Sequence, residues 1–275
     1  MEEFAPFRGQ GTESNPFVLD SIGDFEILRN NFSDLKSHYY VLEHDLIFNE
    51  DHNNYKNWAN TRPAYKFNPL GDIGTGFSGH LDGRGFTIYG LYVDGSELGE
   101  KGIGLFGMLH LAEIKNLHIK NSYIKGCHAT GGLAGRASGS TIENCSFQGV
   151  VYSTNSVAYN GSVGGLVGRF WSGNTMKYCF TEGVVDAYSR SGGLVGTVID
   201  GYNIIQECYS SADVTGLGVK TQPTSGTGGL VGFTQNGTTP TTLVMSKCFF
   251  VGKSPDPGTS TERGPGIGHI YQSTV

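Results

Sequence analysis

The sequence predicts an all-β fold: a single-stranded, right-handed parallel β-helix with a short N-terminal capping helix. The first observation is a repeated glycine motif, which reads GGLAG at 131–135 and GGLVG at 164–168, 192–196 and 228–232. Variants begin at Gly102 (GIGLFG) and Gly264 (GPGIG). From Gly104 to Gly229 the spacing of the motif varies between 28 and 36 residues. An intact motif at a variable period is typical of a solenoid whose coils carry connections of unequal length.

The second observation is that two more short pieces follow each glycine motif. One has the pattern Ile/Met-x-x-Cys, at 142–145, 176–179, 205–208 and 245–248, and an earlier copy has Leu117 at the cysteine position. The other ends in valine, at 149–151, 183–185 and 212–214. No piece is long enough or has the 3.6-residue period of a helix, so we expect three short strands per coil.

Like residues of successive coils are expected to stack inside the solenoid at about the 4.8 Å spacing of neighbouring strands. We predict one inward stack of leucines and one of cysteines. Their members are Leu133, Leu166, Leu194 and Leu230, and Cys145, Cys179, Cys208 and Cys248. The glycines permit tight corners and close approach of the coils. The right-handed winding follows from the strong bias of parallel crossover connections.

The N-terminal region predicts a cap. Residues 9–20 read as an opening turn and first strand, and Ser21 with Asp24 has the spacing of a capping box at a helix start. An apolar stripe from Ile22 to Phe32 gives this helix one face with which to cover the open end of the stack. Strands at 39–42 and 45–48, a long polar loop at 49–66 and a tight turn within 77–88 follow.

We expect one solenoid domain over residues 1–275. Its parts are an N-terminal cap with the first coils (1–101), the glycine repeats (102–252) and a C-terminal partial coil (253–275).

Composition excludes several classes of function. The net charge of -6 disfavours a nucleic-acid surface, which needs a basic face. No apolar run is long enough to span a bilayer, so we expect no membrane insertion. The acidic start Met1-Glu2-Glu3 differs from the basic start of a signal peptide. A trimmed start and a protein that stays inside the cell both remain open.

The repeats, with the I-x-N-C and G-x-V pieces that follow them, resemble the GLUG motif of bacterial surface proteins. The upstream segments GTESNPFVL, YYVLEHDLIF and FSGHLDGRGFTIYGLYV come in an order similar to the β-helical region of gram-positive immunoglobulin A metalloproteases and of adhesin-like proteins. The resemblance covers nearly the whole chain and implies a β-helix at the cell surface or outside the cell. Those proteases carry their zinc site, an HExxH helix, elsewhere, and this sequence has no HExxH.

Metal and cofactor sites are not predicted. The cysteines lack the paired CxxC spacing of zinc sites, and Cys127 stands apart from the four repeat cysteines. A buried ladder of thiols is the expected reading, with one incidental disulfide as the alternative. Among the histidines, only His44-Asp45 with Glu50-Asp51-His52 forms a local cluster, read as a solvated loop with a cation site as the alternative.

Catalytic residues are likewise not predicted. Glycan-cleaving β-helices place acidic or basic residues on an outward strand face, in register across coils. Glu182, Asp186 and Asp213 lie close in repeat phase, but we interpret them as solubilising residues. Asp82 in the DGRG turn is expected to hydrogen-bond its own backbone.

Exposed aromatic residues near the variable connections are the best indication of a ligand site. The candidates are Trp58, Tyr159, Phe170, Trp171 and Tyr188. Such side chains on a rigid scaffold suit recognition of glycans or proteins, and the alternative is packing of the loops onto the solenoid wall.

The function predicted is a non-catalytic extracellular module of a bacterial surface or secreted protein. It would act as a spacer or adhesive element, or recognise a host glycoprotein or glycan, within a parent similar to an immunoglobulin A protease. The alternative is a glycan-cleaving β-helix enzyme, a polysaccharide lyase or hydrolase. The oligomeric state is not predicted.

Overall fold

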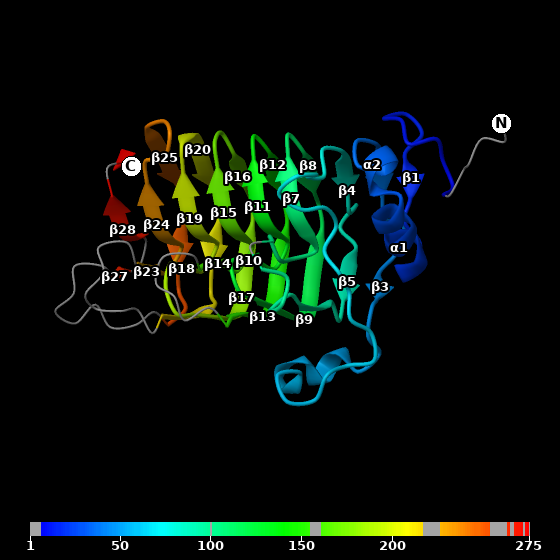
Figure 1. Cartoon of the computed structure of the whole chain (residues 1–275), viewed down its shortest axis with the longest axis horizontal. Helices are drawn as coiled ribbons and strands as arrows, with labels where there is room; N and C mark the ends of the chain where they lie inside the picture. The colour runs from blue at the N-terminus through cyan, green and yellow to red at the C-terminus, as the bar shows by residue number, and fades with distance from the viewer. Residues whose placement is uncertain are drawn as a thin grey trace.

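The protein is a solenoid of parallel strands wound into four sheets (Figure 1). The computed structural model describes residues 7–99, 101–154, 161–216 and 226–253, together with the strand backbone at 263–264, 267–271 and 273–274. Every strand pair in these residues is parallel, and each sheet is built from strands of successive coils. The all-β, solenoid-like prediction is therefore confirmed. The right-handed sense of the winding stays a prediction.

We number the sheets in the order in which a coil passes through them. Sheet I contains β7 (Phe106–His110), β11 (Ala134–Ser138), β15 (Val167–Trp171), β19 (Val195–Ile199), β24 (Val231–Gln235) and β28 (Ile267–Tyr271). Sheet II contains β1 (Phe17–Val18), β2 (Tyr39–Val41), β4 (His80–Asp82), β8 (Glu113–Lys115), β12 (Thr141–Glu143), β16 (Thr175–Lys177), β20 (Gly201–Gln206), β25 (Thr241–Ser246) and β29 (Ser273–Thr274).

Sheets III and IV complete each coil. Sheet III contains β3 (Leu46–Ile47), β5 (Thr87–Tyr89), β6 (Tyr92–Asp94), β9 (His118–Gly126), β13 (Ser146–Ser153), β17 (Phe180–Ala187), β21 (Tyr209–Ser210), β22 (Asp213–Gly216) and β26 (Phe249–Phe250). Sheet IV contains β10 (Ala129–Gly131), β14 (Ser162–Gly164), β18 (Ser191–Gly192), β23 (Thr227–Gly228) and β27 (Arg263–Gly264).

The GGLVG motif forms a corner between two sheets, whereas the sequence predicted one strand there. In the second copy Gly164 ends β14 and Val167 begins β15, so Gly165 and Leu166 make the bend. A Cβ on Gly165 would lie 2.1 Å from the carbonyl oxygen of Gly193 in the next coil, which excludes any larger residue. A coil therefore has four strands and not three. The fourth was missed because the strands of sheet IV are only two or three residues long.

The predicted inward stacks are confirmed. Leu133, Leu166, Leu194 and Leu230 are buried at this corner. The Leu166 amide donates to the Leu194 carbonyl at 3.0 Å, and the Leu194 amide donates to the Leu230 carbonyl at 2.9 Å. Cys145, Cys179 and Cys208 are free thiols buried in the same core, and Cys248 is half-buried. Backbone pairing and apolar packing therefore stay in register from coil to coil.

The corner between sheets II and III is built from residues with left-handed backbone. Asn144 has a φ of 50° and donates from its amide to Asn116 Oδ1 at 2.8 Å. Asn116 in turn donates to Asp82 Oδ1 at 2.9 Å, and Asp82 Oδ1 accepts the Arg84 amide at 2.8 Å. The prediction that Asp82 bonds its own turn is confirmed.

The N-terminal helix begins where the sequence predicts. Ser21 is the N-cap of α1 (Ile22–Asn30) and accepts the Asp24 amide at 3.3 Å. Phe25 and Leu28 are buried, and the Phe25 ring packs edge-on against Phe48 at 5.4 Å. Because β1 and β2 are neighbours in sheet II, α1 and α2 (Phe32–Leu35) fill the rest of the first coil, at the N-terminal end of the stack (Figure 1). Within the described residues, no helix has the length and apolar character needed to cross a bilayer.

Candidate ligand-binding groove

The loop at 49–66 folds back along the outer face of sheet III, below the stack in Figure 1. It carries a short 3-10 helix, η1 (His52–Asn57). Asn49 closes its base: the side-chain amide donates to the Tyr65 carbonyl at 2.9 Å, and its oxygen accepts the Tyr65 amide at 2.8 Å. A segment predicted as an open polar loop is thus a folded flap.

Aromatic packing holds the flap on the sheet. Trp58 is 1% exposed, packs edge-on against Tyr92 at 5.8 Å and donates its indole N–H to Asp51 at 3.1 Å. Tyr92 and Tyr123 project outward from successive coils and stack at 6.0 Å. The prediction of Trp58 as an exposed ligand contact is therefore wrong as to exposure, because a large aromatic ring next to outward tyrosines gains most by burial.

A groove of about 420 Å³ lies where the flap ends and the outer face of sheet III emerges. Its floor is two columns of outward side chains from three successive coils. In register these are Tyr123, Val150 and Val184 in one column, and Lys125, Tyr152 and Asp186 in the other. Lys56 and Ala59 of the flap form the wall. We call this the flap groove.

Charges in the flap groove are arranged around apolar side chains. Lys125 is 3.5 Å from buried Asp94, which Arg62 also approaches at 3.4 Å. Burial alone would raise the pKa of Asp94, but hydrogen bonds from Ser96 and these two cations outweigh it and lower that pKa. Burial raises the pKa of Tyr123 to about 12, so its hydroxyl stays protonated. Asp186 accepts the Thr215 hydroxyl at 2.6 Å.

The three carboxylates that follow one another in repeat phase do not converge on one point. Asp186 lies beside Thr215, whereas Asp213 lies beside Val184 and accepts the Lys253 amide at 3.0 Å. Glu182 is exposed and lies beside Gln148. Each carboxylate therefore has its own neighbours, and only Asp186 lines the flap groove.

The other predicted aromatics are scattered. Phe170 is fully buried in the core, so its predicted exposure is wrong: neighbouring residues of a strand point to opposite faces, and Trp171 takes the outer one. Trp171 is 39% exposed and donates its N–H to Asp200 at 3.2 Å. Tyr188 is half-buried between β17 and β18, and Tyr159 lies outside the described residues.

Sequence reasoning missed most of the flap groove. Tyr123, Val150 and Val184 occupy the same outward position in three successive coils, where polar residues are expected. An apolar or aromatic residue at this position in each coil could have indicated the groove. The side chains around His44 and His52 do not form one cluster. Asp45 accepts the Thr87 amide, and the His52 ring is hydrogen-bonded to Asn121. Within the described ranges no group of three His, Cys, Asp or Glu could hold a metal ion.

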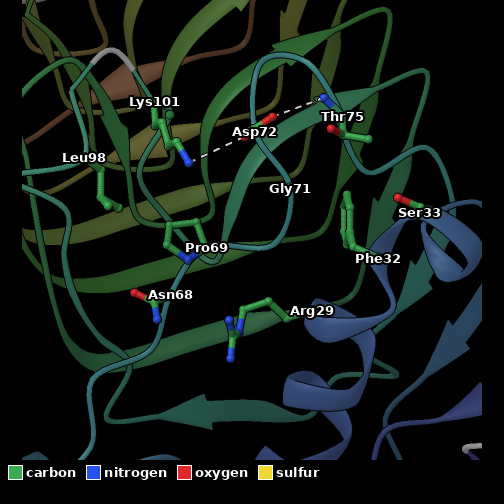
Figure 2. Close-up of a pocket in the computed structure, with 11 residues that line it drawn as sticks. Arg29, Phe32, Ser33, Asn68, Pro69, Gly71, Asp72, Thr75, Leu98 and Lys101 are labelled. Carbon is green, nitrogen blue, oxygen red and sulfur yellow. Dashed lines mark hydrogen bonds and ion pairs between the residues drawn. The ribbon is translucent and has the colours of Figure 1, made fainter.

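Two other hollows are lined by charged side chains that pair with one another. Figure 2 shows a hollow of about 450 Å³ between Phe32 of α2 and the loop at 68–75, where Lys101 pairs with Asp72 at 3.7 Å. A hollow of about 360 Å³ on sheet II holds His80, which stacks on Tyr39 at 4.2 Å with its Nδ1 3.2 Å from Glu113. The flap groove differs from both in having one column of apolar and aromatic side chains in its floor.

Comparison with known proteins agrees with the fold. The family model of the GLUG motif matches residues 126–152. A solved structure titled as a "putative immunoglobulin A1 protease" from Bacteroides ovatus aligns over 96% of this chain and 86% of its own, with a TM-score of 0.55 and 17% identity. At that identity the likeness concerns the fold alone.

Two curated relatives are surface-type proteins by name. Halomucin of Haloquadratum walsbyi is 30% identical over 172 residues, which is 60% of this chain and 2% of halomucin. A "Putative Gly-rich membrane protein" of Evansella cellulosilytica is 28% identical over 144 residues, 51% of this chain and 15% of the relative. The chain thus spans only a small part of the length of each relative.

Proposed function

We propose that this chain, a GLUG-motif β-helical module, is a non-catalytic part of a cell-surface or secreted protein and recognises a host glycoprotein or glycan. The observation that carries the proposal is the flap groove, an amphipathic hollow built on a sheet whose floor strand β13 is paired on both sides. Rigid scaffolds with one elaborated connection are a common way for solenoids to make binding sites. The relatives named as a mucin and a membrane protein support a surface location.

A spacer role fits the same architecture. Sheet II runs without a break from β1 to β29, so the module has the form of a stiff rod. Such a rod would hold the flap groove at a fixed distance from whatever precedes or follows it in a longer parent. An immunoglobulin A protease-like parent remains part of this proposal.

The test is binding of the purified protein to immobilised immunoglobulin A and to immobilised mucin by surface plasmon resonance. We expect saturable binding to one of them, lost in Tyr152→Ala, which removes a ring from the groove floor. Tyr202→Ala is the matched control, since Tyr202 is 59% exposed on sheet II, away from the groove. Equal binding by both variants would refute the groove as the site.

The same samples decide between recognition and the alternative of a glycan-cleaving enzyme. Release of reducing ends or of unsaturated sugars from the mucin would show turnover and would overturn the non-catalytic part of the proposal. We expect neither. Hydrolysis needs two carboxylates that face one another, and Asp186 is the one carboxylate among the residues that line the flap groove.

A further inference from the structure

We infer that the flap groove takes a flat, extended glycan chain that lies along the solenoid axis, one sugar ring to each coil. This inference rests on the proposed function and adds the ligand class and its direction. The floor repeats at the strand spacing of about 4.8 Å, which is close to the length of one pyranose in an extended chain. Three coils contribute to the floor, so a ligand of at least three rings would fill it.

One column of the floor can contact the apolar C–H face of a sugar ring, and the other can hydrogen-bond the hydroxyls at its edge. Val150 and Val184 offer apolar surface, and Val184 is 36% exposed although it lies on an outward face. The C–H face of a pyranose packs on such surface. In the parallel column Lys125 and Asp186 supply a donor and an acceptor for hydroxyls at the edge of the ring, with Tyr152 between them.

A peptide that binds as an added β-strand does not fit the flap groove. Peptides that add to a sheet need an unpaired edge strand. The floor strand β13 is paired on one side with β9 and on the other with β17, so its backbone groups are already bonded. The groove can offer side chains only, which is what recognition of a glycan requires.

A nucleic acid or a lipid also fits poorly. Asp186 in the floor and exposed Glu182 on the same strand repel phosphates. The hollow is open, and ammonium groups from Lys56 and Lys125 flank its apolar part, so it does not enclose an acyl chain. Lys125 remains tied to Asp94, so the groove has little excess charge and suits a neutral chain.

The test uses defined hexasaccharides and isothermal titration calorimetry with the whole chain. Cellohexaose and chitohexaose are flat β-1,4-linked ribbons, whereas maltohexaose is α-1,4-linked and curved. We expect one of the flat probes to bind at least about tenfold more tightly than maltohexaose, with affinity rising from the disaccharide to the tetrasaccharide of the same series.

Variants locate the binding. Tyr152→Ala and Val184→Gln are expected to weaken binding of the flat probe by about tenfold each, and Tyr202→Ala should leave it unchanged. Thermal melts establish that each variant is folded, and Val184→Gln, at an exposed position, serves if Tyr152→Ala unfolds.

Four outcomes would contradict the proposed glycan ligand. Equal binding of maltohexaose and the flat probes, or binding of a flat probe that none of the groove variants weakens, would overturn it. If neither flat probe binds while the glycoprotein of the preceding test is still captured through Tyr152, the inference fails and the proposed function stands. If the glycoprotein is not captured either, both fail.

Discussion

The carboxylate of Asp200 holds a whole connection in place through its hydrogen bonds. It is 3% exposed and accepts the backbone amides of Gly237, Thr238 and Thr239 at 2.8, 3.2 and 2.9 Å. It also accepts the indole N–H of Trp171. The connection at 236–240 is therefore fixed to the solenoid by one side chain.

We predict that Asp200→Asn lowers the free energy of unfolding by about 1–3 kcal/mol at pH 7, because an amide cannot accept all of these donors. Burial alone would raise the pKa of Asp200, but the backbone donors from the loop outweigh it and lower that pKa. A lowered folded-state pKa gives stability that is full above the unfolded value of about 3.9 and is lost as the pH falls through the folded value.

Thermal melts of the wild type and of Asp200→Asn at pH 7 and pH 3 check this. The difference between the two proteins should shrink at pH 3, which is below the unfolded value of about 3.9, because the unfolded wild-type chain then gains stability by taking up a proton at Asp200. A difference that is the same at both pH values would show that the charge of Asp200 contributes nothing.

The cysteines give a second prediction at this scale. Burial raises the pKa of Cys145 to about 12, and contact with the neighbouring thiol of Cys179 raises that of Cys208 to about 12. Cys127 is half-buried, and its thiol donates to the Gly99 carbonyl at 3.0 Å. Maleimide labelling of the native protein, followed by mass spectrometry, should modify Cys127 well before the three buried thiols. Early labelling of Cys179 would mean that the core opens readily.

At the scale of the element, the corner between sheets IV and I explains the repeat. Two glycines let the backbones of successive coils approach, and the leucine that follows fills the space inside. The element is therefore defined by a bend and a side chain. GGLVG resembles a strand in the sequence because its first glycine ends one short strand and its valine begins the next.

We predict that Leu194→Ala lowers the free energy of unfolding by about 2–5 kcal/mol, as for other fully buried leucines. Leu194 is 0% exposed and lies between Leu166 and Leu230, so the cavity cannot be filled from solvent. Leu111→Ala is the matched control, since Leu111 is 66% exposed and should change stability little. Urea titrations measure both variants, and an unchanged midpoint for Leu194→Ala would place this leucine outside the core.

For the whole molecule, the long connections gather at one corner. Residues 155–160 belong to the connection from β13 to β14, and residues 217–225 belong to the connection from β22 to β23, so both connections join sheet III to sheet IV. The flap at 49–66 also starts from sheet III, after β3. The connection at 236–240 is the exception, since it joins sheets I and II. Surface insertions cost little when their ends stay close, so one corner can be elaborated while the coils remain constant.

We predict that replacing residues 50–64 with a short Gly-Ser link leaves the solenoid folded but removes ligand binding. Asn49 and Tyr65 already hold the ends of the flap together, so the link need not be long. Loss of the flap returns the rings of Tyr92 and Tyr123 to water and should cost about 1–3 kcal/mol. A thermal melt and calorimetry with the flat hexasaccharides check both parts. Unchanged affinity would exclude the flap as a wall of the site.

The sequence by itself determined the repeat, the parallel stacking and the identity of the inward leucines and cysteines. These features follow from local rules. Glycine occurs where backbones approach closely, and similar residues occur at the same position of each repeat. It also determined the start of α1, because the Ser21 cap and the apolar stripe are contained in a few consecutive residues. The turn made by Asp82 is local in the same sense.

Contacts between outward residues of different coils depend on the winding of the chain and could not be predicted from the sequence. Trp58 was expected in solvent, but its burial depends on Tyr92 and Tyr123, which reach it through the winding of later coils. The flap groove likewise combines Lys56 with side chains from β9, β13 and β17, more than sixty residues away in the chain. Strand pairing between coils determines these contacts, and packing of the inward core fixes the register of that pairing. The outward residues of one coil therefore do not show which residues of the next coil lie beside them.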